Sequence, residues 1–378
     1  MNTLPELLSG KNINFLIGSG ASMPLYPTLI LGEGLPSFED FVSTGAISRE
    51  NIKWLYCYYY AKWISPMQIA MFDRNDDNYK QVTGSYKAFI NLVLEILDHE
   101  SNEKPKRANV FTTNYDLMFE TTFDDISQEN PICYFNDGSR GFIKRTLDTD
   151  NFYLNVSHSG HHDNFRREVP TINLFIMHGS ITWKKSNEQI KVTYKKNIFQ
   201  ELDRVVQNIE AFDIEDIDCI FESLDPSKSL DMLAAELESG LNDLSLDDDQ
   251  IDDFYQDYEK IPIINPNKWK FHDTVFDQHY YQLIRSFSYE MEKDNSVLII
   301  FAFSFADEHL LDIFKRSMLN PTLQVIVVSF NEKSQNELIE KFSGFNNITY
   351  YPKSFNKEDG SPINGDFEYL NNLLRGQI

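Results

Sequence analysis

Short apolar runs, each ended by glycine or by polar residues, alternate with helical patterns along most of the chain. The apolar runs lie at residues 13–18, 107–113, 171–179, 295–303, 322–330 and, with a weaker pattern, 347–352. Between the last three runs, residues 307–319 and 331–342 carry apolar side chains at the spacing of amphipathic helices. Buried strands that alternate with helices are typical of parallel sheets. We therefore predict an α/β fold with a doubly wound, mainly parallel sheet.

Two long segments interrupt this alternation. Residues 36–104 contain no apolar run of the strand type and much aromatic, helix-compatible sequence, which predicts a helical insertion. Residues 186–268 form a second predicted insertion, which is helical and strongly acidic. The sheet core is then discontinuous in the sequence and comprises residues 1–35, 105–185 and 269–378.

The charge of the chain is concentrated in the second insertion. Of a formal net charge of −24 over 378 residues, residues 201–260 contribute −17, with 20 acidic and 3 basic side chains. Such a field repels nucleic acid, so we expect no direct nucleic-acid binding. The chain has no apolar run of the ~18 residues that a membrane span needs, and its start lacks the pattern of a secretory signal. We therefore expect a soluble, cytoplasmic protein without membrane association.

Three cysteines, Cys57, Cys133 and Cys219, lie far apart and form no CxxC pair. This spacing fits a reducing compartment and predicts neither a disulfide framework nor a zinc site.

Polar and glycine residues follow three of the predicted strands. The first run ends in GSGAS, residues 18–22, where glycines would let the backbone approach a diphosphate. The alternative for this stretch is a tight turn between strand and helix. The run at 107–113 leads into Thr113, Asn114 and Asp116. Asn114 is suited to hold a water or a ribose hydroxyl, and Asp116 to cap the next helix or bond other loop groups; the alternative is that Thr113 and Asn114 are only cap residues.

A histidine, His178, ends the predicted strand at 171–179. It is either a hydrogen-bonded structural residue or a general base near neutral pH. Because the carboxyl ends of parallel strands meet at one edge of a sheet, we expect His178, Asn114 and the glycine loop to converge there.

These residues resemble, in their order along the chain, the motifs of the sirtuin-like NAD-dependent family. Residues 18–22, 112–116 and 178–179 match the family patterns GAGxS, TxNxD and HG. The segment 301–309 is similar to the family's strand-then-GxS segment, with Ser304 at the serine, and 327–332 takes the place of the next nucleotide-side loop. The resemblance implies a Rossmann-like core that binds NAD+ through Gly18, Ser19, Gly20, Ala21, Ser22, Thr113, Asn114, Asp116, Ser304, Ser329 and Asn331, with Asn114 and His178 catalytic.

The sequence departs from the deacylases of that family at three points. It lacks the four zinc-binding cysteines, it has no arginine where the deacylases carry a PDFR-like stretch after the glycine loop, and Ala302 replaces the glycine of GxS. These departures weaken the expectation of an acyl-lysine substrate. They leave the residues that would bind NAD+ and open its glycosidic bond in place.

Family members without the zinc module resemble the NAD+-depleting effectors of bacterial antiviral defence, which act by abortive infection. The resemblance therefore implies a hydrolase, an NAD+ glycohydrolase (NADase), that takes NAD+ as its substrate and needs no zinc. It also implies a homo-oligomer that is activated by assembly or by a partner, for which a HerA-like hexameric ATPase is the candidate.

Two other functions stay open at this point. One is a protein deacylase or ADP-ribosyltransferase that uses the same NAD+ site. The other is a non-catalytic module that senses NAD+ or ADP-ribose, for which the presence of both Asn114 and His178 would be unnecessary.

The remaining histidines and aromatic residues suggest simpler roles. His158, His161 and His162, with Asp163, could be drawn as a metal site, but such runs are more often surface loops. His309 is expected to pack or cap a helix. The aromatic run at 54–63 predicts a buried core or an oligomer interface.

Overall fold

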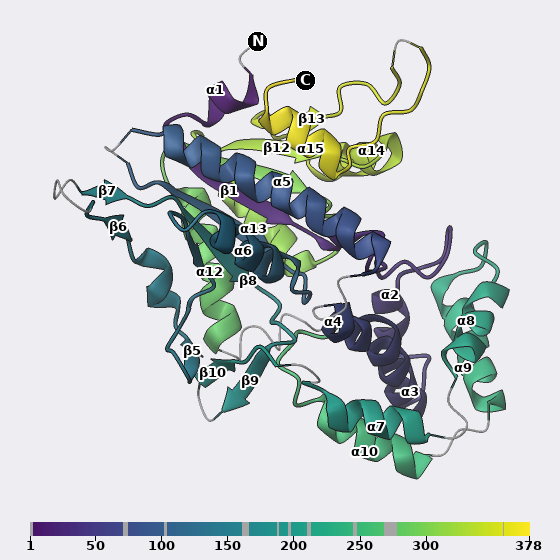
Figure 1. The fold of residues 1–378 in the computed structure, drawn as a ribbon. Helices are drawn as coiled ribbons and strands as arrows, with labels where there is room; N and C mark the ends of the chain where they lie inside the picture. Colours follow the sequence, from purple (N-terminus) through teal and green to yellow (C-terminus); the bar gives the residue numbers. More distant parts are fainter. Residues whose placement is uncertain are drawn as a thin grey trace.

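In the part of the chain that the structure describes, seven parallel strands form one sheet (Figure 1). The computed structural model describes residues 3–70, 75–101, 104–160, 166–186, 189–195, 198–209, 213–244, 248–267, 278–357 and 359–378. The strands are β1 (Asn12–Ile17), β2 (Arg107–Thr112), β3 (Tyr134–Asn136), β8 (Thr171–Ile176), β11 (Ser296–Phe301), β12 (Gln324–Val328) and β13 (Ile348–Tyr351). The predicted α/β fold is confirmed, and each predicted apolar run overlaps one of these strands.

The order of the strands is β13-β12-β11-β1-β2-β8-β3. Without the edge strand β3, the strands follow the order 3-2-1-4-5-6 of a Rossmann fold. The chain therefore leaves β1 toward one side of the sheet and later returns to build the other side from β11. Between β1 and β11 lies the switch point, and its carboxyl edge is where ligands bind in folds of this type.

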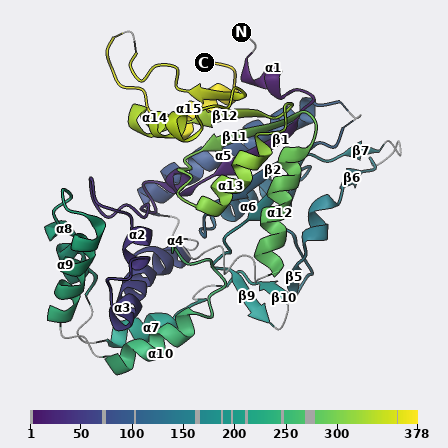
Figure 2. The same cartoon turned by 180° about the vertical axis from the view of Figure 1, so that it is seen from behind.

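The central strands are buried on both faces, which explains why they read as continuous apolar runs. One face is covered by α5 (Asp77–His99), α6 (Met118–Glu129) and α15 (Phe367–Leu374), and the other by α12 (Gln278–Glu292) and α13 (Glu308–Ser317) (Figures 1 and 2). Phe15 meets Phe89 of α5 with ring centroids 4.9 Å apart, and Phe111 meets Phe287 of α12 at 5.1 Å. Aromatic side chains thus fill both layers between sheet and helices.

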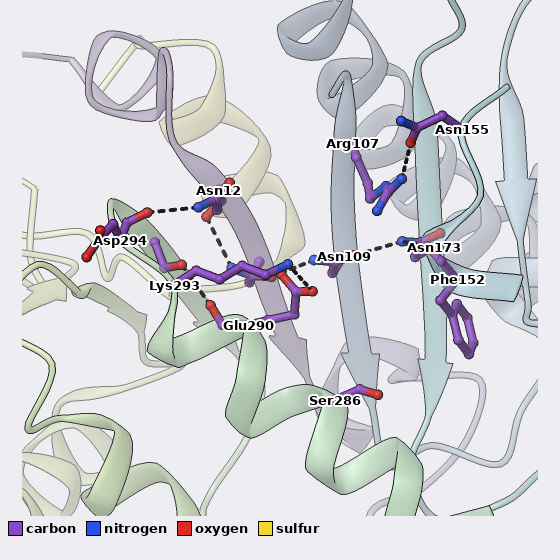
Figure 3. Close-up of polar contacts among 12 residues, drawn as sticks. Asn12, Arg107, Asn109, Phe152, Asn155, Asn173, Ser286, Glu290, Lys293 and Asp294 are labelled. Carbon is purple, nitrogen blue, oxygen red and sulfur yellow. Dashed lines mark hydrogen bonds and ion pairs between the residues drawn. The ribbon is translucent and has the colours of Figure 1, made fainter. Parts of the chain in front are cut away.

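A row of buried asparagines crosses the sheet at one level (Figure 3). Each amide nitrogen donates to the next amide oxygen, from Asn136 to Asn173 (3.0 Å), from Asn173 to Asn109 (2.9 Å) and from Asn109 to Asn14 (2.8 Å). The register of the strands places these residues directly opposite one another. Asn14 ends the row by donating to the carbonyl of Asn12. Because a one-residue slip would break every one of these bonds, the row fixes the register of four strands.

The two predicted insertions pack against each other as one helical body, which lies below the sheet in Figure 1. Its helices from the first insertion are α2 (Phe38–Val42), α3 (Arg49–Tyr59), the π-helix η2 (Tyr60–Ile64) and α4 (Ser65–Ala70), and from the second α7 (Gln200–Asn208), α8 (Ile214–Ser223), α9 (Leu230–Asp243) and α10 (Asp248–Tyr258). The aromatic run lies inside this body, where Tyr56 and Tyr60 pack against Tyr258. α5 also lies within residues 36–104, yet it packs on the sheet.

Lysines of the first insertion meet carboxylates of the second. Lys53 pairs with Asp252 at 2.5 Å, and Lys62 pairs with Asp218. Tyr60 donates a hydrogen bond of 2.6 Å to Asp203. Part of the acidic charge of the second insertion is thus engaged in contacts with the first insertion.

Smaller elements surround the sheet. They are α1 (Leu4–Leu8), η1 (Ser19–Ser22), β4 (Ser139–Arg140), β5 (Arg145–Leu147), η3 (Thr149–Tyr153), β6 (Ser157–His158), β7 (Arg167–Glu168), β9 (Trp183–Ser186), β10 (Gln189–Val192) and α14 (Glu332–Lys341). Strands β4, β5, β10 and β9 form a separate antiparallel sheet in that order. Over the described ranges, none of the helices is long and apolar enough to pass through a membrane.

Candidate functional site

The glycine loop lies at the switch point of the sheet, between the carboxyl ends of β1 and β11. The Gly18 amide donates to the Phe301 carbonyl at 3.1 Å. A Cβ at Gly18 would lie 2.3 Å from the Ala302 carbonyl oxygen, so a side chain is excluded here. Beyond Gly18, Ser19 is exposed at the surface, and Ala21 and Ser22 turn inward as part of η1. The glycine therefore permits close contact between two strand ends and leaves the outer part of the loop accessible.

Asn114 is joined to this loop by its side chain. Its Nδ2 donates to the Gly18 carbonyl at 3.2 Å, and its backbone amide donates to Thr112 Oγ1 at 3.1 Å. The side chain is only 7% exposed. Within the described residues, no group donates a hydrogen bond to the buried Asn114 Oδ1. An unsatisfied buried acceptor is costly, so this oxygen is available to a ligand or a water. Thr113, beside it, is half-buried.

Asp116 ties the β2 loop to the glycine loop. Ser22 Oγ donates to Asp116 Oδ2 at 2.8 Å and lies 2.9 Å from the hydroxyl of Tyr86. The other carboxyl oxygen, Oδ1, accepts the Met118 amide at the start of α6. Burial raises the pKa of Asp116, and the hydrogen bonds from Met118 and Ser22 oppose that rise. Asp116 thus holds the two loops together and has its acceptors occupied by the protein.

His178 pairs with an aspartate that the sequence motifs did not single out. Its Nε2 lies 3.0 Å from Asp307 Oδ2, and both side chains are less than a tenth exposed. Asp307 is also the N-cap of α13, where its Oδ1 accepts the Leu310 amide at 3.0 Å. In the sequence, Asp307 reads as a helix cap, so only the capping role could have been expected.

The loop before Asp307 follows an unusual path. It leaves β11 and reaches the end of β8, although β1 and β2 lie between those strands. Ala302 and Phe305 both have a φ of 54°, the left-handed conformation that side chains disfavour. Lys341 donates to the carbonyls of Ser304 and Phe305 and so supports this turn from α14.

A segment that leaves the acidic insertion covers the histidine. The Ile264 amide donates to the His178 carbonyl at 2.8 Å, and the Tyr115 hydroxyl donates to the Ile264 carbonyl. Gly179, with a φ of +86°, forms a bridge with Ile263, and a Cβ there would lie 2.1 Å from the Pro262 carbonyl oxygen. We call residues 261–264 the covering segment. It contacts the backbone of His178 and Gly179 and the side chain of Tyr115.

The remaining predicted site residues are spread along the same edge. Ser304 is exposed after β11. Ser329 is buried at the end of β12, and no donor or acceptor among the described residues reaches its hydroxyl. Asn331 caps α14 by accepting the Ser334 amide at 2.8 Å, so its side chain is already engaged in the fold. The structure thus brings Gly18, Ser22, Asn114 and Asp116 into direct contact. Ser304, Ser329 and Asn331 make no recorded contact with those four residues in the described chain.

The histidine run at 158–162 lies only partly within the described residues. His158 is in β6 and its Nδ1 accepts the Gly160 amide, while residues 161–163 lie outside the described ranges. Burial lowers the pKa of His309, which is half-buried near Asp307. In the described chain, no three histidine, cysteine or acidic side chains are arranged to hold a metal ion.

No known protein family and no curated protein matches the sequence.

Proposed function

We propose that this chain is an NAD+ glycohydrolase, which cleaves NAD+ to nicotinamide and ADP-ribose. The observation that carries the proposal is the arrangement of Asn114 and His178 at one sheet edge. Asn114 is hydrogen-bonded to the glycine loop and offers an unsatisfied Oδ1. His178 is hydrogen-bonded to Asp307 at the end of the strand next to β2.

The glycine loop would receive the diphosphate of NAD+. It lies at the switch point, where Rossmann folds bind dinucleotides, and its outer residues Ser19 and Gly20 are accessible. Because the protein is acidic, the negative charge of the phosphates must be balanced by groups in the loop itself. Backbone N–H groups supply that contact without a lysine or an arginine.

The chemical step needs orientation more than a strong acid. The bond between ribose C1′ and the nicotinamide nitrogen breaks with its electron pair leaving on nicotinamide, and a water oxygen bonds to C1′. Asn114 Oδ1 would hold this water or a ribose hydroxyl by accepting its hydrogen bond. One proton of the water passes to His178, and the products are nicotinamide, ADP-ribose and that proton.

Asp307 would assist His178 as a positioning residue. If Nε2 carries the proton that it shares with Asp307, Nδ1 is the nitrogen left to accept a proton. The carboxylate then stabilises the imidazolium that forms, as a buried aspartate does in other His–Asp pairs.

NAD+ reaches these groups only after an opening, since Asn114 and His178 are 7% and 5% exposed, and we assign that opening to the covering segment. We include this opening in the proposal as the point of control. An NADase that depletes NAD+ in antiviral defence needs such restraint, and a homo-oligomer or a HerA-like ATPase is the proposed source of the opening. The support for this biological role is the motif resemblance alone.

The test is to incubate the purified full chain with NAD+, alone and with the candidate ATPase, and to quantify nicotinamide by chromatography. We expect release without an acyl-peptide, and its loss in Asn114→Ala and His178→Ala variants that keep the wild-type melting curve. Release that requires an acyl-peptide would instead indicate a deacylase, and binding of NAD+ without turnover would indicate a sensor. Activity retained in both variants would refute the mechanism.

A further inference from the structure

A cleft of about 520 Å³ lies along α6, the helix that follows the Asn114 loop. One wall is α6 itself, and the opposite wall comes from the end of β3, from β5 and from the segment after β10. Its volume falls in the range of about 300–1,000 Å³ typical of small-molecule sites. None of the residues assigned to NAD+ above lines this cleft.

The apolar part of the cleft is suited to a flat ring. Leu117, Phe123 and Phe135 contribute to its lining. The rings of Phe123 and Phe135 are stacked, with centroids 4.3 Å apart and planes at 26°. Aromatic walls of this kind favour a planar, compact ligand over a flexible chain.

Glu120 contributes to the cleft a carboxyl oxygen, Oε1, that has no hydrogen-bond partner among the described residues. Its side chain lines the cleft from α6 and is 8% exposed. Within the described residues, no donor reaches its buried Oε1. Burial raises the pKa of this carboxyl well above its ordinary range, and the negative charges of Asp116 and Asp137 add to the rise. A carboxyl in this position gains most from a ligand that brings N–H donors.

Elsewhere in the lining of the cleft, an N–H donor already pairs with a carboxylate. The Arg145 guanidinium donates to Asp137 Oδ2 at 2.8 Å and lies over the ring of Tyr194, 5.4 Å from its centroid. Asp137 also accepts from Ser139 and from the Tyr194 hydroxyl, so its acceptors are in use. One N–H group of Arg145 thus pairs with Asp137, while no donor among the described residues reaches Glu120 Oε1.

The charge of the lining selects against anions. Among the described residues that line the cleft, the carboxyls of Glu120, Asp124 and Asp137 face the single guanidinium of Arg145. A cationic ligand is therefore favoured over an anionic one. An amidinium that binds Glu120 displaces the proton that the raised pKa retains there, and the resulting carboxylate accepts two parallel N–H···O bonds.

We propose that this cleft is a second ligand site, which binds a compact aromatic amidine or amine with its N–H groups on Glu120 and its ring against Phe123 and Phe135. The proposal is independent of the NADase activity. The ligand would bind against one side of α6, and the loop that holds Asn114 leads into the start of the same helix. A bound ligand therefore contacts the helix that follows the proposed catalytic asparagine.

The test is calorimetric titration of the full chain with benzamidine, which has the required ring and N–H fork. Benzoate, with the same ring and the opposite charge, is the ligand control. We expect saturable binding of benzamidine, no binding of benzoate, and affinity reduced by roughly tenfold or more in Glu120→Gln. Glu129→Gln, which changes an exposed carboxyl on the same helix, is the matched control and should bind like the wild type.

A second variant decides the outcome if Glu120→Gln does not fold. Ser127→Phe would fill the cleft from its half-buried rim without changing Glu120, and it should abolish binding. Absence of saturable binding to the wild type overturns the proposal. So does equal benzamidine affinity in the wild type and in a folded Glu120→Gln or Ser127→Phe variant.

Discussion

His178 Nε2 lies 3.0 Å from Asp307 Oδ2, although the strands that precede these two residues are separated by two others in the sheet. The pairing requires the loop after β11 to pass over the carboxyl ends of β1 and β2. That path brings one loop into contact with the glycine turn at Ala302 and with the histidine at Asp307. A single segment therefore links the switch point of the sheet to the proposed base.

The first prediction concerns Asp307. Asp307→Asn removes the carboxylate charge but keeps a good helix cap, so the melting temperature should stay close to that of the wild type. The turnover number for NAD+ should fall by roughly a hundredfold or more because the imidazolium loses its counter-charge, while KM should change little. Steady-state kinetics of nicotinamide release measure both quantities.

Asp307→Ala separates the two roles of this residue. It should show the same loss of turnover and in addition lose about 1 kcal/mol of stability with the cap. A wild-type turnover number in Asp307→Asn would show that Asp307 only caps α13.

The second prediction concerns the covering segment. Tyr115→Phe removes the hydroxyl that donates to the Ile264 carbonyl and leaves the ring in place. The loss of about 1 kcal/mol should speed exchange of the Ile264 amide, which is bound to the His178 carbonyl, roughly fivefold. Hydrogen-exchange mass spectrometry of peptides across residues 259–267 measures this change.

Tyr281→Phe alters an exposed tyrosine of α12 and serves as the control. If opening limits the proposed reaction, Tyr115→Phe should also raise NADase activity by a similar factor. Unchanged exchange in Tyr115→Phe would contradict the assignment of residues 261–264 as a segment held in place by Tyr115.

Most of the sheet could be predicted because buried parallel strands leave a continuous apolar signal. β3 could not, since two of its three residues are partly exposed and the third is the buried but polar Asn136. The packing of the two insertions against each other could not be predicted either. Each insertion shows helical periodicity, but periodicity does not identify the partner helix, and the contacts of Lys53 with Asp252 and of Tyr60 with Asp203 connect residues far apart in the sequence.

The site could be predicted where residues directly follow strands. Gly18, Asn114 and His178 each follow a strand, so the topology alone places them at one edge. Asp307 follows a five-residue loop in which two residues, Ala302 and Phe305, have the left-handed backbone conformation. Neither alanine nor phenylalanine favours that conformation, so the sequence does not predict the path of the loop. Asn331 caps α14, a role that the motif resemblance did not indicate, and its contact with NAD+ stays a prediction.

The third prediction concerns the asparagine row. Asn109→Leu would leave Asn14 Oδ1 without its donor and remove the Asn109 oxygen that Asn173 Nδ2 binds. Asn173 keeps a second contact, to the Phe152 carbonyl, so its loss is partial. We expect the free energy of unfolding to fall by about 2–5 kcal/mol, with urea denaturation as the measurement.

Asn155→Leu is the control for that experiment, since Asn155 is an exposed amide near the same strands, and its effect should stay within about 0.5 kcal/mol. The double variant Asn109→Leu with Asn173→Leu should cost less than the sum of the single changes, because the two leucines leave fewer orphaned groups. Additive costs would mean that the two amides stabilise the sheet independently.

The fourth prediction concerns the pH dependence that Glu120 imposes on stability. Its pKa is raised in the folded state by burial, so the folded protein retains a proton that the unfolded chain releases above about pH 4.5. The stability that this proton provides is fully present below that pH and is lost as the pH rises toward the folded pKa. Glu120→Gln cannot ionise, so its stability relative to the wild type should increase with pH through this window, by about 1.4 kcal/mol for each pH unit. Urea denaturation of both proteins between pH 4 and 8 measures the difference. A difference that stays constant with pH would show that Glu120 is already paired with a donor in solution, and saturating benzamidine should reduce the slope by supplying one.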